Sequence, residues 1–252
     1  MEYIPKIIHY CWFGRNPLPK SAQKCIASWR KFLPDYEIKE WNEDNFDVNI
    51  IPYTQQAYEA KKFAFVSDYA RFWILYKYGG VYFDTDVEVI KPLNDIIEKG
   101  PFLGIEAPAT LSKKQVAEVA PGLGMAAPPG QDLFRTLLDL YDNIAFVLAD
   151  GSYNQKTIVK YTTEILHNNG FNRKNEIQEV SGFTIYPADY FCPMDSTTGI
   201  ITITTNTRTI HHYDCSWINH LSLSYQIHLL KNRIYRIIGT SIAKKIHWWL
   251  HP

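Results

Sequence analysis

Two aspartates, Asp84 and Asp86, stand one residue apart directly after the apolar residues 81–83. The apolar run predicts a short β-strand, and side chains alternate between the two faces of a strand. Both carboxylates are therefore expected on one face, where like charges need a cation or hydrogen-bond donors between them. Oxygen ligands at this spacing suit Mg²⁺ or Mn²⁺ that holds a diphosphate. The alternative is a pair of solvated aspartates at the end of a strand.

A second pair of charged residues, Asp68 and Arg71, stands three positions apart in a stretch with helical spacing. Residues at this separation share one face of a helix. The planar guanidinium of arginine makes paired hydrogen bonds to oxygens, as phosphates and sugars require. The alternative is a common surface ion pair, which contributes little to stability.

The elements expected around these residues alternate between strand and helix along the first third of the chain. Hydrophobic spacing predicts strands over 4–13, 36–41 and 81–83, a helix over 21–33, and a long helical stretch over 54–78 that can break in its middle. This order predicts an α/β fold with a mostly parallel sheet. Ligands in such folds bind beyond the carboxyl ends of the strands, which is where the aspartate pair lies.

The rest of the chain is expected to add further strands and helices around an acceptor-side loop. Residues 107–130, rich in Ala, Pro and Gly, are expected to form that loop over the site. The other expected elements are a strand at 102–106, helices at 132–149 and 154–168, extended segments at 184–186 and 200–213, and a helical segment at 222–250.

Composition narrows the class of protein. Of the 252 residues, 46% are hydrophobic and 21% charged, which is typical of a globular chain and not of a disordered one. The net charge of zero gives no indication of nucleic-acid binding. The four cysteines show no C-x-x-C spacing, so neither a zinc site nor a redox pair is expected. Without a signal peptide or an 18-residue apolar run, the chain is expected to be cytoplasmic.

The last part of the chain differs in charge from the rest. Residues 215–252 contain five Lys or Arg residues and no Asp or Glu. Apolar residues and terminal tryptophans accompany these cations, as in helices that lie on anionic membranes. The alternative is a helix packed on the catalytic domain. We therefore expect a catalytic domain over 1–217 and a basic amphipathic helical segment over 218–252.

Four segments, 4–14, 65–71, 78–86 and 210–217, together resemble the DXD-containing sugar transferases (glycosyltransferase family 32). This family is typified by yeast initiating mannosyltransferases and bacterial capsular-polysaccharide glycosyltransferases, and the clostridial glucosylating toxins are more distant relatives. The resemblance is specific from 4 to 92, returns at 210–217 and is loose between. It implies a GT-A-like fold, a Rossmann-like mixed sheet flanked by helices, here with a helical C-terminal extension. It also implies a nucleotide-sugar donor, a divalent metal and retention at the anomeric carbon.

The resemblance assigns roles to the charged residues. Asp86 would bind the metal directly, and Asp84 would contact the donor ribose and sugar or reach the metal through water. His211 would approach the metal or the diphosphate, since imidazole is an acceptable Mn²⁺ ligand. Asp68 would bind hydroxyls of the donor sugar, and Arg71 the same sugar or the phosphates. Asp68, Arg71 and Asp84 form the expected catalytic set.

The same resemblance assigns donor contacts to five further residues. Trp12 would stack on the donor base, Ser67 would contact the nucleotide, and the Tyr82 hydroxyl would lie near the phosphates. Ser216 and Trp217 would contact the diphosphate and close the site. For Trp12 and Tyr82 the alternative is core packing.

The expected function is metal-dependent transfer of a hexose or N-acetylhexosamine, with Mn²⁺ or Mg²⁺, from a UDP-sugar or alternatively a GDP-sugar. The expected acceptor is a surface polysaccharide or oligosaccharide, lipid-linked, reached from the inner face of a membrane. The alternatives are a phosphohydrolase that uses Asp84 and a catalytically silent glycan-binding or membrane-scaffold protein. Glu106 and Glu118 are further acids after the metal motif, but the sequence singles out neither as a catalytic nucleophile.

Overall fold

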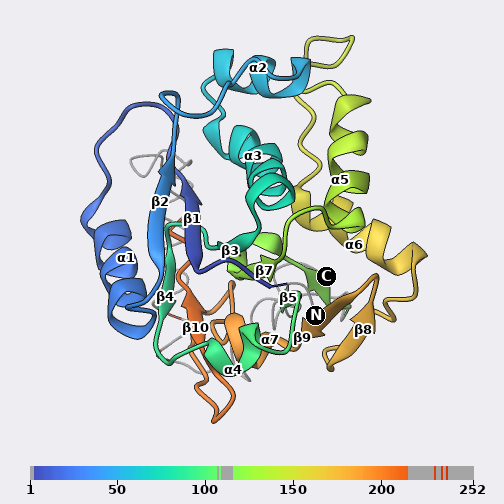
Figure 1. Ribbon diagram of the computed structural model, residues 1–252. Helices are drawn as coiled ribbons and strands as arrows, with labels where there is room; N and C mark the ends of the chain where they lie inside the picture. The colour runs from blue at the N-terminus through green and yellow to red at the C-terminus, as the bar shows by residue number, and fades with distance from the viewer. Residues whose placement is uncertain are drawn as a thin grey trace.

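The computed structural model describes residues 3–106, 108, 116–214 and the single positions 230, 234 and 237. Its centre is a mixed sheet flanked by helices, as predicted (Figure 1). From one edge to the other the strands are β2 (Glu37–Trp41), β1 (Ile7–Cys11), β3 (Gly80–Tyr82), β7 (Met125–Ala127), β5 (Phe102–Glu106), β9 (Phe183–Tyr186) and β8 (Gln178–Val180), and β6 (Glu118–Val119) pairs with β5. Strands β7, β6 and β8 run against the other five.

Alternation along β1 divides the interior into two layers. Ile8 and Tyr10 point toward α1 (Lys20–Phe32), where they join the cluster around Trp29. Cys11 points to the opposite face, into the cluster shared with the larger group of helices. Those helices are α2 (Pro52–Glu59), α3 (Phe63–Tyr78), α5 (Asp132–Asp142) and α6 (Ile158–Asn168).

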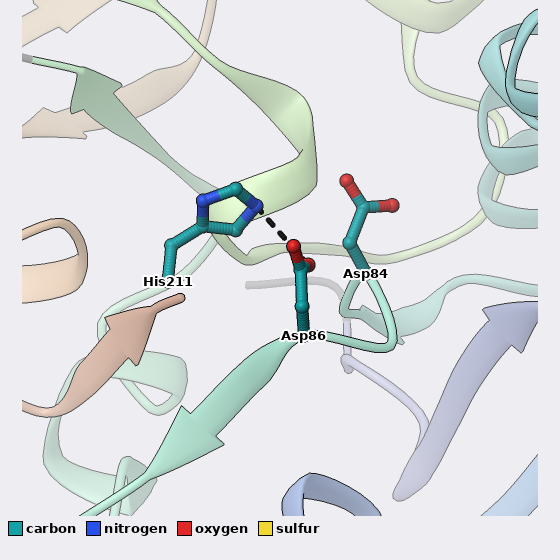
Figure 2. Close-up of side chains that lie close together, drawn as sticks. All are labelled: Asp84, Asp86 and His211. Carbon is teal, nitrogen blue, oxygen red and sulfur yellow. Dashed lines mark ion pairs between the residues drawn. The ribbon is translucent and has the colours of Figure 1, made fainter. Parts of the chain in front are cut away.

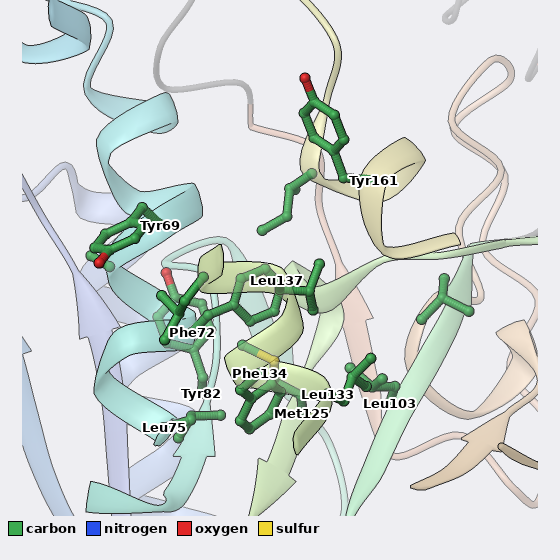
Figure 3. Close-up of a cluster of buried hydrophobic side chains, with 14 of the residues drawn as sticks. Tyr69, Phe72, Leu75, Tyr82, Leu103, Met125, Leu133, Phe134, Leu137 and Tyr161 are labelled. Carbon is green, nitrogen blue, oxygen red and sulfur yellow. The ribbon is translucent and has the colours of Figure 1, made fainter. Parts of the chain in front are cut away.

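The larger layer holds α3 against the sheet. Figure 3 shows Phe72 and Leu75 of α3 facing Phe134 of α5, with Tyr82 and Met125 of the sheet beside them. Phe72, Leu75, Phe134 and Met125 are fully buried. Truncating one buried Phe of this kind costs roughly 3–5 kcal/mol. This layer therefore fixes the position of the helix that carries Asp68 and Arg71.

A second, two-stranded sheet lies next to the central one. It pairs β4 (Val87–Val89) with β10 (Thr209–His211) in antiparallel register, with His211 opposite Val87. This register brings His211 beside the residues that precede β4, although more than 120 positions separate them in the sequence. The remaining elements are α4 (Asn94–Ile97), the 3₁₀ turn η1 (Pro121–Leu123) and α7 (Ala188–Phe191).

Several expected elements differ from those observed. The helical stretch 54–78 does break in its middle, which the prediction allowed, because Lys61 between α2 and α3 has a φ of 57° that no right-handed helix accepts. The expected loop 107–130 holds β6, η1 and β7 in its described part. The helix at 132–149 ends at Asp142, the helix at 154–168 begins at Ile158, and within 200–213 only Thr209–His211 forms a strand.

Most of the C-terminal segment lies outside the described residues, as do Ser216 and Trp217. Of residues 218–252, the structure describes Leu230, Ile234 and Ile237, and each of these is helical. The division of the chain at 217 and the extended helix therefore stay predictions. Within the described part of the chain, no helix is long and apolar enough to cross a membrane.

Candidate active site

Asp84 and Asp86 lie in a tight turn between β3 and β4, and not on a strand as expected. Strand β3 stops at Tyr82, and the Asp84 N–H then donates to the carbonyl of Gly122 at 3.1 Å. The Val87 N–H donates to the Asp84 carbonyl at 3.1 Å, which closes the turn. The two carboxylates are neighbours because of this turn. The prediction that strand alternation brings the two carboxylates to one face was therefore wrong, because the turn and not a strand places them.

His211 completes a cluster of three possible metal ligands (Figure 2). One ligand atom each from Asp84, Asp86 and His211 lies within 4.8 Å of the others. The Nε2 atom of His211 is 3.1 Å from Oδ1 of Asp86. The other Asp86 oxygen accepts the backbone N–H of Asp214 at 3.0 Å, so the carboxylate has a fixed orientation.

The donor set of this cluster fits a hard or borderline divalent cation. Two carboxylates and an imidazole are ligands that Mn²⁺ accepts, and carboxylates suit Mg²⁺. Two atoms bound at about 2.1 Å to one Mg²⁺ lie at most about 4.2 Å apart, so the ligands need to close only slightly around an ion.

Charge links the members of the cluster. Burial alone lowers the pKa of His211, but the negative charge of Asp86 and their hydrogen bond raise it to about 9. For Asp86, burial raises the pKa, and the charge and hydrogen bond of His211 more than offset this, so the pKa is lowered. His211 and Asp86 therefore form an ion pair in which His211 is protonated and Asp86 is ionised. The carboxylates of the cluster thus favour a positive charge beside them.

Asp68 and Arg71 are buried in the site and do not form the surface ion pair that was the alternative. Arg71 Nη2 is 3.1 Å from Asp68 Oδ1, and its Nη1 is 3.2 Å from Asp84 Oδ1. The guanidinium also lies over the ring of Tyr82, with its carbon 4.9 Å from the ring centroid. One guanidinium therefore joins the helix α3 carboxylate to the turn that carries Asp84.

Burial acts on the pKa values of Asp68 and Arg71 in opposite directions. Burial raises the pKa of Asp68 to about 7, although Arg71 pulls it down. Burial works to lower the pKa of Arg71, but nearby carboxylates, Asp84 first, raise it above its usual value. Arg71 is thus a permanent cation shared by two carboxylates, and burial makes Asp68 gain a proton more readily than an exposed aspartate does.

Trp12, Ser67 and Tyr82 lie around the same charged groups. Tyr82 donates its hydroxyl hydrogen to Asp84 Oδ1 at 3.1 Å, although its side chain is buried. Ser67 uses its hydroxyl within α3, where it donates to the Phe63 carbonyl at 3.2 Å. Trp12 is half-buried and donates its indole N–H to the Asn16 carbonyl at 2.6 Å. It is not enclosed in the core.

A cavity of about 600 Å³ connects these residues. The residues predicted for the site that line it are Trp12, Ser67, Asp68, Arg71, Asp84, Asp86 and His211. Tyr82 reaches the cavity only through its hydrogen bond to Asp84. Of the two histidines in sequence, His212 turns away and bonds Glu88 at 2.8 Å.

The sequence did not single out two other polar residues of the cavity, Glu106 and Tyr213. Glu106 is the last residue of β5, and the Tyr213 hydroxyl donates to its Oε1 at 2.9 Å. Its place at the carboxyl end of a strand is the same signal that indicated Asp84. Glu118 lies opposite Glu106 in β6, bonds Arg173 and does not line the cavity.

Comparison with known proteins confirms the resemblance found in the sequence. Residues 19–103 match the family described as "Glycosyltransferase sugar-binding region containing DXD motif". "Inositol phosphoceramide mannosyltransferase 1" of Schizosaccharomyces pombe is 31% identical over 114 residues, which are 41% of this chain and 34% of that protein. "Mannosyl phosphorylinositol ceramide synthase" of Saccharomyces cerevisiae is 29% identical over 126 residues, 47% of this chain and 32% of that protein. The chain thus spans about a third of the length of these curated relatives.

Solved structures of glycosyltransferases show weaker similarity. The PaToxG glycosyltransferase is 20% identical, with a TM-score of 0.47 over 66% of this chain and 70% of that one. A glycosyltransferase involved in glycosylating the major capsid of PBCV-1 is 11% identical, with a TM-score of 0.46 over 92% of this chain and 100% of that one.

Proposed function

We propose that this chain is a metal-dependent glycosyltransferase that moves a hexose or N-acetylhexosamine from a nucleotide sugar to a glycan acceptor. The observation that carries the proposal is the cluster of Asp84, Asp86 and His211, whose ligand atoms lie within 4.8 Å of one another in the cavity. Both aspartates fall inside residues 19–103, which match the DXD-containing family.

The volume of the cavity and the charges along its wall suit a nucleotide sugar. About 600 Å³ is within the usual range for a site that encloses a small molecule. Asp84, Asp86 and His211 would hold Mn²⁺ or Mg²⁺, which when bound neutralises the charge of a diphosphate leaving group. Arg71 presents donors to sugar or phosphate oxygens, and Asp68 presents acceptors to sugar hydroxyls. The half-buried ring of Trp12 gives the cavity an aromatic wall for the base.

The acceptor that we propose is lipid-linked and lies at an anionic membrane surface, on its cytoplasmic side. Two of the relatives are named for transfer to, or synthesis of, an inositol-containing ceramide lipid. Leu230, Ile234 and Ile237 are helical, and 58%, 46% and 84% of their surfaces are exposed. Their spacing places them on one helix face, within a segment that carries five cations and no acids.

Binding to vesicles tests this membrane proposal. The full chain is expected to co-sediment with vesicles that contain phosphatidylserine, and replacing Leu230, Ile234 and Ile237 with serine should abolish binding. Equal recovery of both proteins with the vesicles would overturn it.

The phosphohydrolase alternative has less support than the transferase. The Asp84 carboxylate accepts hydrogen bonds from Tyr82 and Arg71, which hold it in place and reduce its strength as a nucleophile. It also leaves the match of residues 19–103 to a sugar-transferase family unexplained.

The test is a screen of UDP- and GDP-sugars by thermal shift and by release of nucleoside diphosphate, with Mn²⁺ and with EDTA. One donor is expected to stabilise the protein and turn over only with the metal present. Asp86→Ala should lose both effects. Asp35→Ala is the matched control, because Asp35 is exposed and its ion pair among the described residues is a 4.0 Å contact with Lys6. Metal-independent turnover, or equal turnover in Asp86→Ala, would overturn the proposal.

A further inference from the structure

Glu106 differs from the other three carboxylates that line the cavity. Asp68 and Asp84 share Arg71, and Asp86 is paired with His211. Among the described residues, Glu106 has no ion-pair partner, and its protein donor is the neutral hydroxyl of Tyr213 at 2.9 Å. One carboxylate oxygen is thus held, and no described residue donates to the other, which is left for a donor within the cavity.

Tyr213 is fixed firmly enough to orient that carboxylate. Its hydroxyl also lies 2.9 Å from Cys192 Sγ, and its ring meets the ring of His211 edge-on, with centroids 4.4 Å apart. The backbone of Tyr213 has a φ of 51°, a conformation that non-glycine residues adopt at a cost. Strain of this kind persists where the surroundings over-determine it, and it is common at functional sites.

The position of Glu106 sets it apart from the groups assigned to the donor. It comes from the end of β5, whereas Asp84 and Asp86 come from the turn after β3, and Arg71 from α3. All of them reach the same cavity. A substrate hydroxyl needs an acceptor for its hydrogen, and an uncommitted carboxylate supplies one.

We propose that Glu106 is the catalytic base that binds the reacting hydroxyl of the acceptor, and that Tyr213 is its positioning residue. This inference rests on the proposed function. As the acceptor oxygen bonds to the anomeric carbon, the bond from that carbon to the diphosphate oxygen breaks. The diphosphate leaves with the electron pair, and the acceptor proton moves to Glu106 and then to solvent.

The surroundings of Glu106 suit this role. Burial raises its pKa, and this outweighs the hydrogen bond from Tyr213, which lowers it. A carboxylate with a raised pKa is a stronger base, and general-base catalysis is worth typically about 10²- to 10⁴-fold in rate.

The test compares Glu106→Gln with Glu118→Gln in the full chain. Glutamine keeps an oxygen that can accept the Tyr213 hydrogen bond but cannot take a proton. Glu118 is the matched control because it lies opposite Glu106 in the neighbouring strand and outside the cavity. Two quantities are measured: release of nucleoside diphosphate from the donor found in the screen, with water as acceptor, and calorimetric binding of Mn²⁺ plus nucleoside diphosphate.

Glu106→Gln is expected to lower kcat by about 10²-fold or more while binding changes less than about twofold. Glu118→Gln should match wild type in both. Wild-type turnover in Glu106→Gln, or a loss of nucleotide binding equal to the loss of rate, would overturn the inference and leave the transferase intact. If wild type releases no nucleoside diphosphate from any donor, the proposed function fails instead.

A double-mutant cycle separates positioning from structural support. Tyr213→Phe should lower kcat at an unchanged donor KM, but should have no further effect on kcat in the Glu106→Gln background, since it acts through that carboxylate. Additive losses would show that Tyr213 acts independently of Glu106 and would overturn its positioning role.

Discussion

His9 makes the stability of the sheet beneath the site depend on pH. Its ring is 1% exposed, with Nε2 3.0 Å from the Gly79 carbonyl. The indole N–H of Trp41 donates to its Nδ1 at 3.0 Å. Because Nδ1 is an acceptor, the ring is neutral and carries its hydrogen on Nε2. A second proton would break the bond from Trp41 and place a charge in the core. Burial accordingly lowers the pKa of His9 from 6.5 to about 4, against the hydrogen bond to Gly79.

The size of the effect follows from that difference in pKa. Between pH 4 and 6.5 the unfolded chain binds more protons at His9 than the folded one, so stability rises with pH. The contribution of neutral His9 to the free energy of unfolding is therefore fully present above pH 6.5 and falls as the pH drops toward 4. The full loss is about 3.4 kcal/mol at about 1.36 kcal/mol per pKa unit, and about 2 kcal/mol of it has gone at pH 5.

Urea unfolding at pH 7 and pH 5 measures this loss. His9→Gln keeps a donor and an acceptor but cannot titrate, so it should lose about 2 kcal/mol less than wild type over that interval. His167→Gln is the control, since His167 lies on α6 and its Nδ1 contacts the nearby carbonyl of Phe171. If His9→Gln and wild type lost equal stability between the two pH values, His9 would not be a buried neutral group in the folded protein.

Three further predictions concern Arg71, Gly122 and Tyr141. Arg71→Met should destabilise the protein by about 3 kcal/mol in urea unfolding, because two buried carboxylates lose their cation, whereas Arg135→Met, at exposed pairs, should cost less than about 1 kcal/mol. Gly122→Ala should weaken Mn²⁺ binding in calorimetry at least about tenfold, since its Cβ would collide with the Asp84 carboxylate; unchanged affinity would refute that contact. Tyr141→Phe should raise stability by about 1 kcal/mol, because its buried hydroxyl has no partner among the described residues; a loss of more than about 1 kcal/mol would contradict this.

The alternation of strand and helix was predictable because it depends on local patterns. Apolar runs located β1 and β3, and the pair Gly79 and Gly80 correctly marked the end of α3. Both glycines have positive φ, at 61° and 103°, which explains why no other residue type serves there as well. A break within 54–78 was allowed for, but its position at Lys61 was not predictable, because the hydrophobic spacing continues across it.

Contacts between residues far apart in the sequence fix the features of the site that could not be predicted. The turn that carries Asp84 and Asp86 depends on the Gly122 carbonyl, 38 residues from Asp84. The interpretation of Asp68 and Arg71 as a site depended on burial, because a spacing of three is the same on an exposed face. Glu106 stayed one of two equivalent acids until the fold placed Tyr213 beside it.

The balance of charge in the cavity indicates the order in which its ligands bind. Among the described residues, its wall carries four carboxylates, Asp68, Asp84, Asp86 and Glu106, and two largely enclosed cationic groups, Arg71 and His211. Lys61 adds a third cation, but it is exposed. A diphosphate entering this wall alone would meet excess negative charge at low dielectric, where repulsion is strong. A divalent ion at Asp84 and Asp86 would remove that excess where the proposed function places the diphosphate. If the proposed function is right, we therefore expect the metal to bind before the nucleotide or together with it.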